Sequence, residues 1–266
     1  MLNNPIANAR TSDIVVDKVS LRYGTGDGSV LALNGLSLEV HKQEFCVIVG
    51  PSGCGKSSLL YLIAGLEDRT GGMIKVGGRP VSDPGADRGM VFQAYTLFPW
   101  LTVKQNVEYG PRRKGIAAAE RNSIVDHYLA EIGLSAFRDH YPSQLSGGMK
   151  QRVAIARALA NDPEVLLMDE PFGALDSQTR HAMQQLLLSV WEHSKKTVLF
   201  VTHDIDEAIL LADRVFVMSG RPGQIRKEFL IGFERPRHMD LVMEPEFIAM
   251  KREILGLLKN SEDDLH

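Results

Sequence analysis

The hydrophobic residues of this chain form several short runs that do not alternate with polar residues. Glu44–Val49, Val165–Met168 and Thr197–Val201 are such runs, and they are typical of strands covered on both faces, as in a parallel sheet. Leu31–Val40 alternates instead, which indicates an antiparallel strand with one solvated face. The pattern predicts an antiparallel β layer ahead of a mostly parallel sheet. Further strands are expected at 14–16, 19–23, 71–78 and 88–92, and a last one at 215–218.

Other segments carry apolar residues at helical spacing. Residues 58–66 and 178–190 each have such a face. Residues 115–160 read as helical, with Gly133 at a helix end, and a final helix is expected to start at Glu244-Pro245. Strands that alternate with helices place the chain in the α/β class. Arg235–His238 is predicted to be a linker to the final helix.

Composition bounds the possibilities further. The 266 residues are 44% hydrophobic, enough for the core of one large domain or of a domain with a subdomain. The net charge of −3 and the lack of a long basic run give no indication of a nucleic-acid partner. No signal pattern begins the sequence, and no apolar run approaches the ~18 residues that a membrane span needs. Any membrane role is therefore expected to act through partners.

Two cysteines, Cys46 and Cys54, have neither disulfide nor metal-site spacing. Cys46 reads as a buried strand residue. Cys54 lies near the start of a helix, which is expected to favour its thiolate; the alternative is that it is only a small residue of a loop.

One glycine-rich segment separates the Glu44–Val49 run from the following helix. Gly50-Pro51-Ser52-Gly53-Cys54-Gly55-Lys56-Ser57 reads G-x-x-x-x-G-K-S, the phosphate-binding P-loop. Its glycines let backbone amides point inward, and the helix adds free N–H groups and the positive end of its dipole. Lys56 supplies a charge for the β- and γ-phosphates, and Ser57 a hydroxyl for Mg²⁺. We therefore expect a nucleotide site rather than a chance glycine turn.

Polar residues follow two of the buried strands. Asp169 and Glu170 come at the end of the Val165–Met168 run, and His203 follows Thr197–Val201. The carboxyl ends of strands in an open α/β sheet are where ligands gather. Beside a P-loop, Asp169 is expected to hold Mg²⁺ and Glu170 to orient or deprotonate the attacking water. His203 is a candidate γ-phosphate contact, against the alternative of a structural histidine, and Asp204 with Glu207 resembles a capping box.

A second helix start also contains serine and glycine. Gln144–Arg152 includes Leu145-Ser146-Gly147-Gly148 and leads into an apolar helix. Free amides and a hydroxyl there suit an anion, and the alternative is a simple cap with flexible glycines.

Aromatic residues mark two further places. Tyr23 lies beside a glycine turn, where it either stacks on a base or is an ordinary strand residue. Leu97, Phe98, Trp100 and Leu101 cluster around Pro99, which indicates either a partner surface or a small core under a loop.

In their order and spacing these motifs resemble the nucleotide-binding subunit of ABC transporters. The segments that carry the resemblance, which spans roughly 12–235, are Gly50–Ser57, Gln93, Leu145–Arg152, Val165–Glu170, Ala174–Asp176 and His203. The resemblance implies an ABC ATPase domain at 12–235, with a P-loop core and a helical subdomain inserted at about 94–160. Residues 236–266 are then a C-terminal helical extension.

The same resemblance implies a head-to-tail homodimer with two ATP molecules between its subunits. Ser146, Gly147 and Gly148 of one subunit then face the γ-phosphate held by the other. Roles carry over residue by residue: Tyr23 stacks on adenine, the P-loop with Ser58 binds phosphate, and Ser57, Gln93 and Asp169 hold Mg²⁺. Glu170 is the general base, Gln93 and His203 also contact the reacting groups, and Asp176 couples the two sites.

A closer resemblance is to the nitrate/sulfonate/taurine branch of bacterial importers. It rests on Asp87–Gln93, Leu97–Val103, Ser219–Gly223 and the variant Met149-Lys150. It implies transmembrane permease subunits as direct partners, an extracytoplasmic solute-binding protein as an indirect one, and a peripheral location at the cytoplasmic face of a bacterial membrane. The aromatic cluster would receive a permease helix.

Other functions remain open at this point. An ABC exporter or lipoprotein-release ATPase would share the same core. A soluble ABC ATPase acting on DNA or ribosomes would call for a coiled-coil insertion, zinc cysteines or two cassettes, none of which the sequence contains. A P-loop phosphotransferase would not need Leu145–Arg152, and Glu170 with His203 argues against a scaffold that hydrolyses little ATP.

Overall fold

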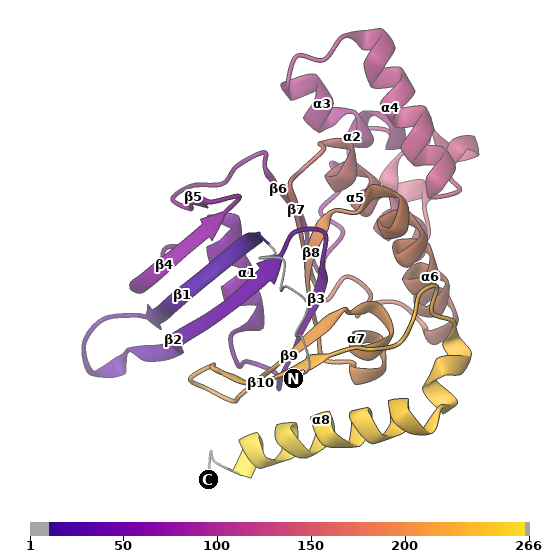
Figure 1. Cartoon of the computed structure of the whole chain (residues 1–266). Coiled ribbons are helices and arrows are strands. Elements are labelled where there is room, and N and C mark those ends of the chain that lie inside the picture. Colours follow the sequence, from indigo (N-terminus) through magenta and orange to yellow (C-terminus); the bar gives the residue numbers. More distant parts are fainter. Residues whose placement is uncertain (1–10, 264–266) are drawn as a thin grey trace, which may run out of the picture.

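The computed structural model describes residues 11–263. Its central sheet has six strands in the order β10-β9-β3-β8-β7-β6. The strands β3, β8, β7 and β6 pair in parallel, as do β3 and β9, so the predicted mostly parallel sheet is confirmed (Figure 1). The bounds are Phe45–Val49 for β3, Arg88–Val91 for β6, Val165–Asp169 for β7, Thr197–Thr202 for β8, Arg214–Met218 for β9 and Ile225–Leu230 for β10.

The edge strand β10 was not predicted, and the expectation that 215–218 is the last strand is wrong. β10 runs antiparallel to β9. Its sequence, IRKEFL, places only Phe229 in the core, so its exposed charged residues hide the strand periodicity.

A second sheet is antiparallel, in the order β2-β1-β4-β5. The two strands expected at 14–16 and 19–23 are one strand, β1, interrupted by a register shift near Lys18, whose φ is 48°. The bounds are Ser12–Tyr23 for β1, Val30–His41 for β2, Gly71–Val76 for β4 and Arg79–Pro80 for β5.

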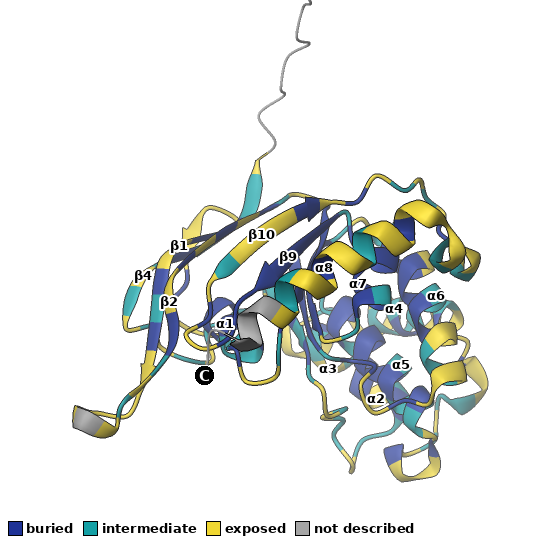
Figure 2. Cartoon of the chain, turned by 90° about the horizontal axis from the view of Figure 1, so that it is seen from below, coloured by how far each residue is buried: buried dark blue, intermediate teal, exposed yellow. Residues whose placement is uncertain are grey.

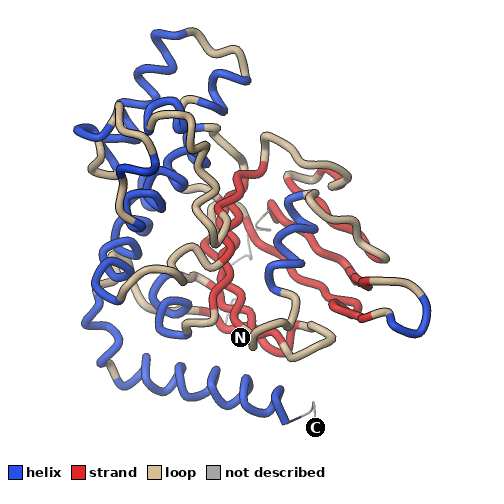
Figure 3. The backbone as a smooth tube through the Cα atoms, turned by 180° about the vertical axis from the view of Figure 1, so that it is seen from behind, coloured by secondary structure: helices blue, strands red, loops and turns tan. Residues whose placement is uncertain are grey.

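The helix α1 (Lys56–Ala64) lies between the two sheets (Figure 3). Successive residues of β3 face opposite sides of the central sheet. Cys46 and Ile48 join a core with α1 and the antiparallel sheet, whereas Phe45, Val47 and Val49 join a second core under the remaining helices. Both faces of the strand are thus covered, which is why its sequence shows no alternation.

A helical portion lies between β6 and β7 in the chain and has its own small core. The helical tract predicted over 115–160 is interrupted, and Gly133, at φ 67°, ends one helix as expected. Its amide donates to the Ala130 carbonyl, and the Leu134 amide donates to the Leu129 carbonyl. The helices are α2 (Val103–Val107), α3 (Tyr109–Arg113), α4 (Ala118–Glu131) and α5 (Gly147–Ala160), with short 3-10 turns at Ser135–Phe137 and Pro142–Gln144.

The remaining helices are α6 (Ser177–Ser194), α7 (Ile205–Leu211) and α8 (Pro245–Asp263). The predicted start of α8 is confirmed. Its residues Phe247 and Ile254 are fully buried in the same core as Phe45, while its opposite side is exposed (Figure 2). None of the helices in residues 11–263 is both long and apolar enough to cross a membrane.

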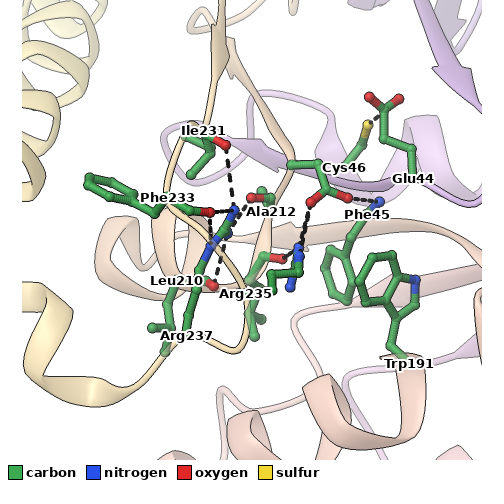
Figure 4. A network of polar contacts seen from close by, with 12 residues as sticks. Glu44, Phe45, Cys46, Trp191, Leu210, Ala212, Ile231, Phe233, Arg235 and Arg237 are labelled. Atoms are coloured by element: carbon green, nitrogen blue, oxygen red, sulfur yellow. Dashed lines mark hydrogen bonds and ion pairs between the residues drawn. The ribbon is translucent and has the colours of Figure 1, made fainter. Parts of the chain in front are cut away.

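Arg235–His238 is not the linker that the sequence predicted. Arg237 is buried, and its guanidinium donates to the carbonyls of Leu210, Ala212 and Phe233 (Figure 4). Burial lowers the pKa of Arg237 to about 10. The segment therefore anchors the chain beside the end of α7 before it continues through a 3-10 turn (Met239–Met243) into α8.

Candidate nucleotide-binding site

The P-loop joins the end of β3 to the start of α1. Gly53 and Gly55 have φ of 75° and 102°, a region that favours glycine. Gly50 is needed for another reason, since there is no room for a side chain. A Cβ there would come within 2.9 Å of the Cys54 sulfur and 3.1 Å of Met218. The helix α1 has no side-chain cap at its start, so its first amides have no side-chain acceptor.

Lys56 is the first residue of α1, and its side chain reaches back to the loop. Its Nζ donates to the carbonyls of Gly50, at 2.8 Å, and Pro51, at 2.9 Å, and the residue is only 6% exposed. The loop thus fixes an ammonium beside the free amides, an arrangement that attracts an anion.

Cys54 does not have the favoured thiolate that the sequence predicted. Its side chain is buried under the loop, and burial raises the pKa of its thiol despite the nearby Lys56. The helix start is too weak to overcome the loss of hydration, which leaves Cys54 as a packed, small residue.

The last residue of β7, Asp169, connects the sheet to α1. Its Oδ1 accepts a hydrogen bond from Ser57 Oγ at 2.8 Å, and its Oδ2 accepts one from Tyr61 at 3.1 Å. Burial raises the pKa of Asp169. Sequence reasoning missed Tyr61, although its position one helical turn after Ser57 could have pointed to it.

Glu170 and His203 meet at the ends of neighbouring strands. Glu170 Oε2 lies 2.9 Å from His203 Nδ1. Glu170 has a φ of 40°, a strained conformation for a residue other than glycine, of the kind that clusters at functional sites. Its amide donates to the Val201 carbonyl at 3.0 Å, which holds the turn in place.

A cleft of about 360 Å³ lies over the P-loop. Gln93 Nε2 and Glu170 Oε2 are each 3.8 Å from where a Cβ on Gly173 would lie, so the amide and the carboxylate share one end of the cleft. Tyr23 is at its rim, where its hydroxyl is within hydrogen-bond distance of Ser58 Oγ and Glu67. The cleft is lined by Tyr23, Ala32, Ser52, Gly53, Gly55, Lys56, Ser57, Ser58, Gln93, Glu170 and Arg221.

Ala32 and Arg221 were not predicted to belong to this site. Arg221 reaches the P-loop from the β9–β10 connection, and its Nη2 donates to the Gly53 carbonyl at 3.2 Å. It lies 168 residues from Gly53 in the chain, and no spacing rule could have joined the two.

Ser146, Gly147, Gly148 and Asp176 do not line this cleft. They lie together elsewhere, because a Cβ on Gly148 would be 2.6 Å from Thr179, three residues after Asp176. Ser146 Oγ accepts from the Met149 amide at 3.3 Å, and Asp176 Oδ1 accepts from the Thr179 amide at 3.0 Å. Ser146 thus caps α5 and Asp176 caps α6. Ser146, Gly147, Gly148 and Asp176 together form a separate surface, which we call the signature face.

Comparison with known proteins decides the family. The family model described as ABC transporter matches residues 33–173. An uncharacterised ABC transporter ATP-binding protein of Methanocaldococcus jannaschii is 53% identical over 92% of this chain and 91% of its own length. The chain belongs to the ABC transporter ATP-binding proteins. As in that family, it is an ATP hydrolase, and we call it the ABC ATPase.

Other relatives of the ABC ATPase have more specific names. A nitrate import ATP-binding protein of Synechocystis sp. is 50% identical, over 89% of this chain and 91% of the relative. A taurine import ATP-binding protein of Jannaschia sp. is 44% identical, over 95% and 96%. Among solved structures, a dimeric post-hydrolysis ATP-binding cassette bound to ADP and Pi has a TM-score of 0.72 and 36% identity, covering 83% of this chain and all of that one.

The residues around Asp169 suit Mg²⁺ by their chemistry. A carboxylate, the Ser57 hydroxyl and the nearby Gln93 amide are all oxygen donors, the type that Mg²⁺ prefers. Within residues 11–263 no group of three or more His, Cys, Asp or Glu residues could hold a metal. An ion at Asp169 would therefore need further oxygens from a nucleotide, as is usual for Mg²⁺ at phosphate sites.

The predicted capping box at α7 is only half present. Asp204 Oδ1 accepts from the Glu207 amide at 3.1 Å, as expected. The Asp204 amide, however, donates to Thr202 Oγ1 at 3.0 Å, and Glu207 turns inward to Gln184. The Thr202 hydroxyl takes the place of the glutamate, because Glu207 is drawn into the space between α6 and α7.

Proposed function

We propose that the cleft over the P-loop binds MgATP, and that hydrolysis there powers an importer for a small anionic solute of the nitrate, sulfonate or taurine type. The observation that carries the proposal is the pairing of Glu170 with His203 at the end of a cleft that also contains Lys56. A carboxylate beside an anion-binding loop is what activation of a water against a phosphate requires.

The hydrolytic step uses Glu170 as the general base. One of its oxygens takes a proton from the water that attacks the γ-phosphorus, as the bond to the leaving ADP breaks. The contact from His203 Nδ1 to Oε2 holds the carboxylate in one orientation, and the Nε2 side of the ring is then available to the γ-phosphate. Gln93, whose side-chain amide shares that end of the cleft, positions the same water.

The remaining residues of the cleft bind ATP before it is hydrolysed. Lys56 and the P-loop amides from Gly50 to Ser58 bind the phosphates, and Tyr23 stacks on the adenine. Ser57, Asp169 and Gln93 hold Mg²⁺, which neutralises charge on the β- and γ-phosphates.

The signature face completes the site of a second copy of the chain. Ser146, Gly147 and Gly148 contact the γ-phosphate bound by the partner subunit, and Asp176 carries the state of one site to the other. The support is that α5 offers a helix start outside its own cleft, and that a related cassette with 36% identity is a dimer. The two copies enclose two ATP molecules head to tail.

The permease contacts the aromatic residues that follow Gln93. Phe98 packs against Trp100, with ring centroids 5.8 Å apart, and Tyr109, at 4.6 Å, and Arg157 lies over its ring. A cavity of about 340 Å³ beside Phe98 and Tyr109 suits a helix of a membrane subunit. The ABC ATPase would therefore be peripheral, at the cytoplasmic face of the membrane, with a solute-binding protein on the other side.

A mixing experiment tests the shared site. In a Glu170→Gln background, which allows binding without turnover, one sample carries Lys56→Ala and the other Ser146→Arg. Neither is expected to dimerise in MgATP, because each damages both sites of a homodimer. Mixed together they form dimers with one intact site, and gel filtration detects them. If the mixture stays monomeric while the Glu170→Gln parent dimerises, the head-to-tail arrangement is wrong.

A second experiment tests the permease surface. Trp100 is 70% exposed, and Leu230, on β10, is 73% exposed and serves as a matched control. Trp100→Ala is expected to reduce co-purification of the permease with the ABC ATPase, while Leu230→Ala leaves it unchanged. Equal yields from both variants would remove the aromatic cluster from the interface.

A further inference from the structure

A second cavity, of about 320 Å³, lies between α6, α7 and the 3-10 turn Met239–Met243. None of its lining residues lines the nucleotide cleft. Its volume is within the range of small-molecule sites, roughly 300–1,000 Å³. Both helices and the segment that Arg237 anchors contribute walls, so the cavity belongs to the folded core.

Two buried acceptor atoms at this cavity lack a partner in the described part of the chain. Gln184 is 3% exposed, and its Nε2 donates to Glu207 Oε1 at 2.9 Å, which leaves its Oε1 unbonded. Asp206 accepts from Lys251 through Oδ2 at 2.7 Å, but its buried Oδ1 has no donor. A buried acceptor without a hydrogen bond is unfavourable, so a donor that reached these atoms would be held strongly.

The charge around the cavity favours a cation. Asp204, Asp206, Glu207 and Asp240 line it. Arg180 and His181 are the basic residues of the lining. Arg180 lies 3.7 Å from Asp204 and its Nη2 donates to the Leu175 carbonyl at 3.0 Å, while its buried Nε has no partner in the described part of the chain. The four carboxylates still outnumber these two side chains. Burial raises the pKa of Glu207 to about 6, so this carboxyl is mostly ionised above neutral pH.

Apart from Ser177 and His181, the rest of the lining is apolar. Leu210, Met239, Val242 and Met243 face the same space, which suits an aliphatic chain. A metal ion is disfavoured, because residues 11–263 contain no cluster of three His, Cys, Asp or Glu that could hold one. A ligand that suits this cavity therefore has positively charged N–H donors attached to an aliphatic chain.

We propose that this cavity is a binding site for an organic cation with a guanidinium or ammonium head, which donates hydrogen bonds to Gln184 and Asp206. Its ligand bridges α6, whose N-cap is Asp176, and α7, whose N-cap is Asp204. The proposal does not rest on the proposed transport function, because binding can be measured on the chain without nucleotide.

The head group could belong to a free polyamine-like molecule or to an arginine or lysine side chain of a partner protein. Agmatine, which has a guanidinium and an ammonium on a four-carbon chain, serves as the probe. Butanediol, which has the same chain length without charge, is its matched neutral compound.

Agmatine is expected to raise the melting temperature of the full chain saturably, with a dissociation constant that calorimetry gives directly. Gln184→Met keeps the shape and apolar contacts of the side chain but removes the acceptor, and it is expected to weaken agmatine binding about tenfold. Gln178→Met, at an exposed position of the same helix that does not line the cavity, is the control and is expected to bind normally.

Asp240→Asn is a second variant, which keeps the test decisive if Gln184→Met does not fold. Asp240 is exposed, so its substitution is expected to leave folding intact. It is expected to weaken agmatine binding about two- to threefold without a change in fold. Agmatine that still binds the assembled transporter identifies a free cation as the ligand, whereas loss of binding on assembly identifies a side chain of a partner.

Several results would overturn the proposal. They are the absence of saturable agmatine binding up to millimolar concentrations, equal stabilisation by butanediol, and equal affinity in Gln184→Met and the parent chain.

Discussion

The helix starts of α1 and α5 are alike in sequence and differ in what surrounds them. At α1 no side chain caps the first amides, and Lys56 supplies a fixed charge beside them. At α5 the Ser146 hydroxyl already bonds the Met149 amide, and the two glycines are packed against neighbouring residues. A Cβ on Gly147 would lie 2.8 Å from the Tyr95 hydroxyl.

The carboxylates beside the two helix starts also differ, both in burial and in the direction of their pKa shifts. Asp169 is buried, and burial raises its pKa, whereas hydrogen bonds from the Thr179 backbone and side chain lower the pKa of the exposed Asp176. The first region thus combines free amides with a fixed positive charge. The second is a surface whose helix starts are already capped by their own side chains. Glycine and serine at a helix start therefore do not by themselves define a phosphate site, since the surrounding charge decides.

The largest expected effect separates chemistry from binding in the first region. Glu170→Gln should lower the turnover number by about 100- to 10,000-fold, because it removes the proposed general base, while nucleotide affinity stays near the parent value. Phosphate release and nucleotide titration measure the two quantities. Glu164→Gln, at the exposed amino end of the same strand, is the control and should keep full activity. A Glu170→Gln enzyme with parental turnover would remove Glu170 from the mechanism.

A pair of lysine variants compares the two helix starts directly. Lys56→Ala should weaken ATP binding by the isolated chain by roughly 10- to 100-fold, the value of a charge-assisted contact. Lys150→Ala, at the start of α5, should leave that affinity unchanged because the signature face lies outside the cleft. Equilibrium titration with a fluorescent nucleotide measures both. Equal losses would mean that the two regions form one site within a single chain.

Two serine variants separate the structural role of the signature face from its proposed role at phosphate. Ser146→Ala should cost about 1 kcal/mol of unfolding free energy as a lost cap and about tenfold in hydrolysis. Ser146→Asp retains a good cap and so should keep its stability, yet it should hydrolyse even less because its charge repels phosphate. Urea unfolding and phosphate release report the two effects. If Ser146→Asp is as active as the parent, no phosphate approaches this residue.

Backbone strain is also expected at Glu170, in the cleft, but not at Glu164. Because Glu170 has a φ of 40°, Glu170→Gly should be about 1 kcal/mol more stable than Glu170→Ala. At Glu164, which is not at positive φ, the order should reverse. Chemical unfolding of the four variants gives the comparison. The same order at both positions would show that Glu170 stores no strain.

The smallest effects concern pH, and their signs are opposite in the two regions. The folded pKa of Asp169 is raised, so its stabilising contribution is present below its unfolded pKa and is lost as pH rises through the folded value. Asp169→Asn should therefore gain stability relative to the parent as pH rises. The folded pKa of Asp176 is lowered, so its contribution is present above the unfolded pKa and is lost in acid. Asp176→Asn should lose stability relative to the parent as pH rises. Melting temperatures measured from acid to neutral pH test both, and slopes of the same sign would contradict the contrast.

Much of this protein follows from its sequence alone. The non-alternating runs around Phe45 and Val165 determine a sheet covered on both faces, and the Gly50–Ser57 spacing determines a phosphate loop at the end of one strand. The start of α8 at Pro245 and the end of α4 at Gly133 also follow, because each depends on residues within one or two helical turns. These features are local, and local sequence specifies them.

Only the tertiary structure decided the rest. Asp169 bonds Ser57 across 112 residues, and Arg221 reaches Gly53 across 168. Burial made Cys54 a poor thiolate and turned Arg237 from a linker residue into an anchor, and β10 is a strand because β9 offers it an open edge. Distance in space, dehydration and the pairing of edges depend on how distant segments pack, and no spacing along the chain records them.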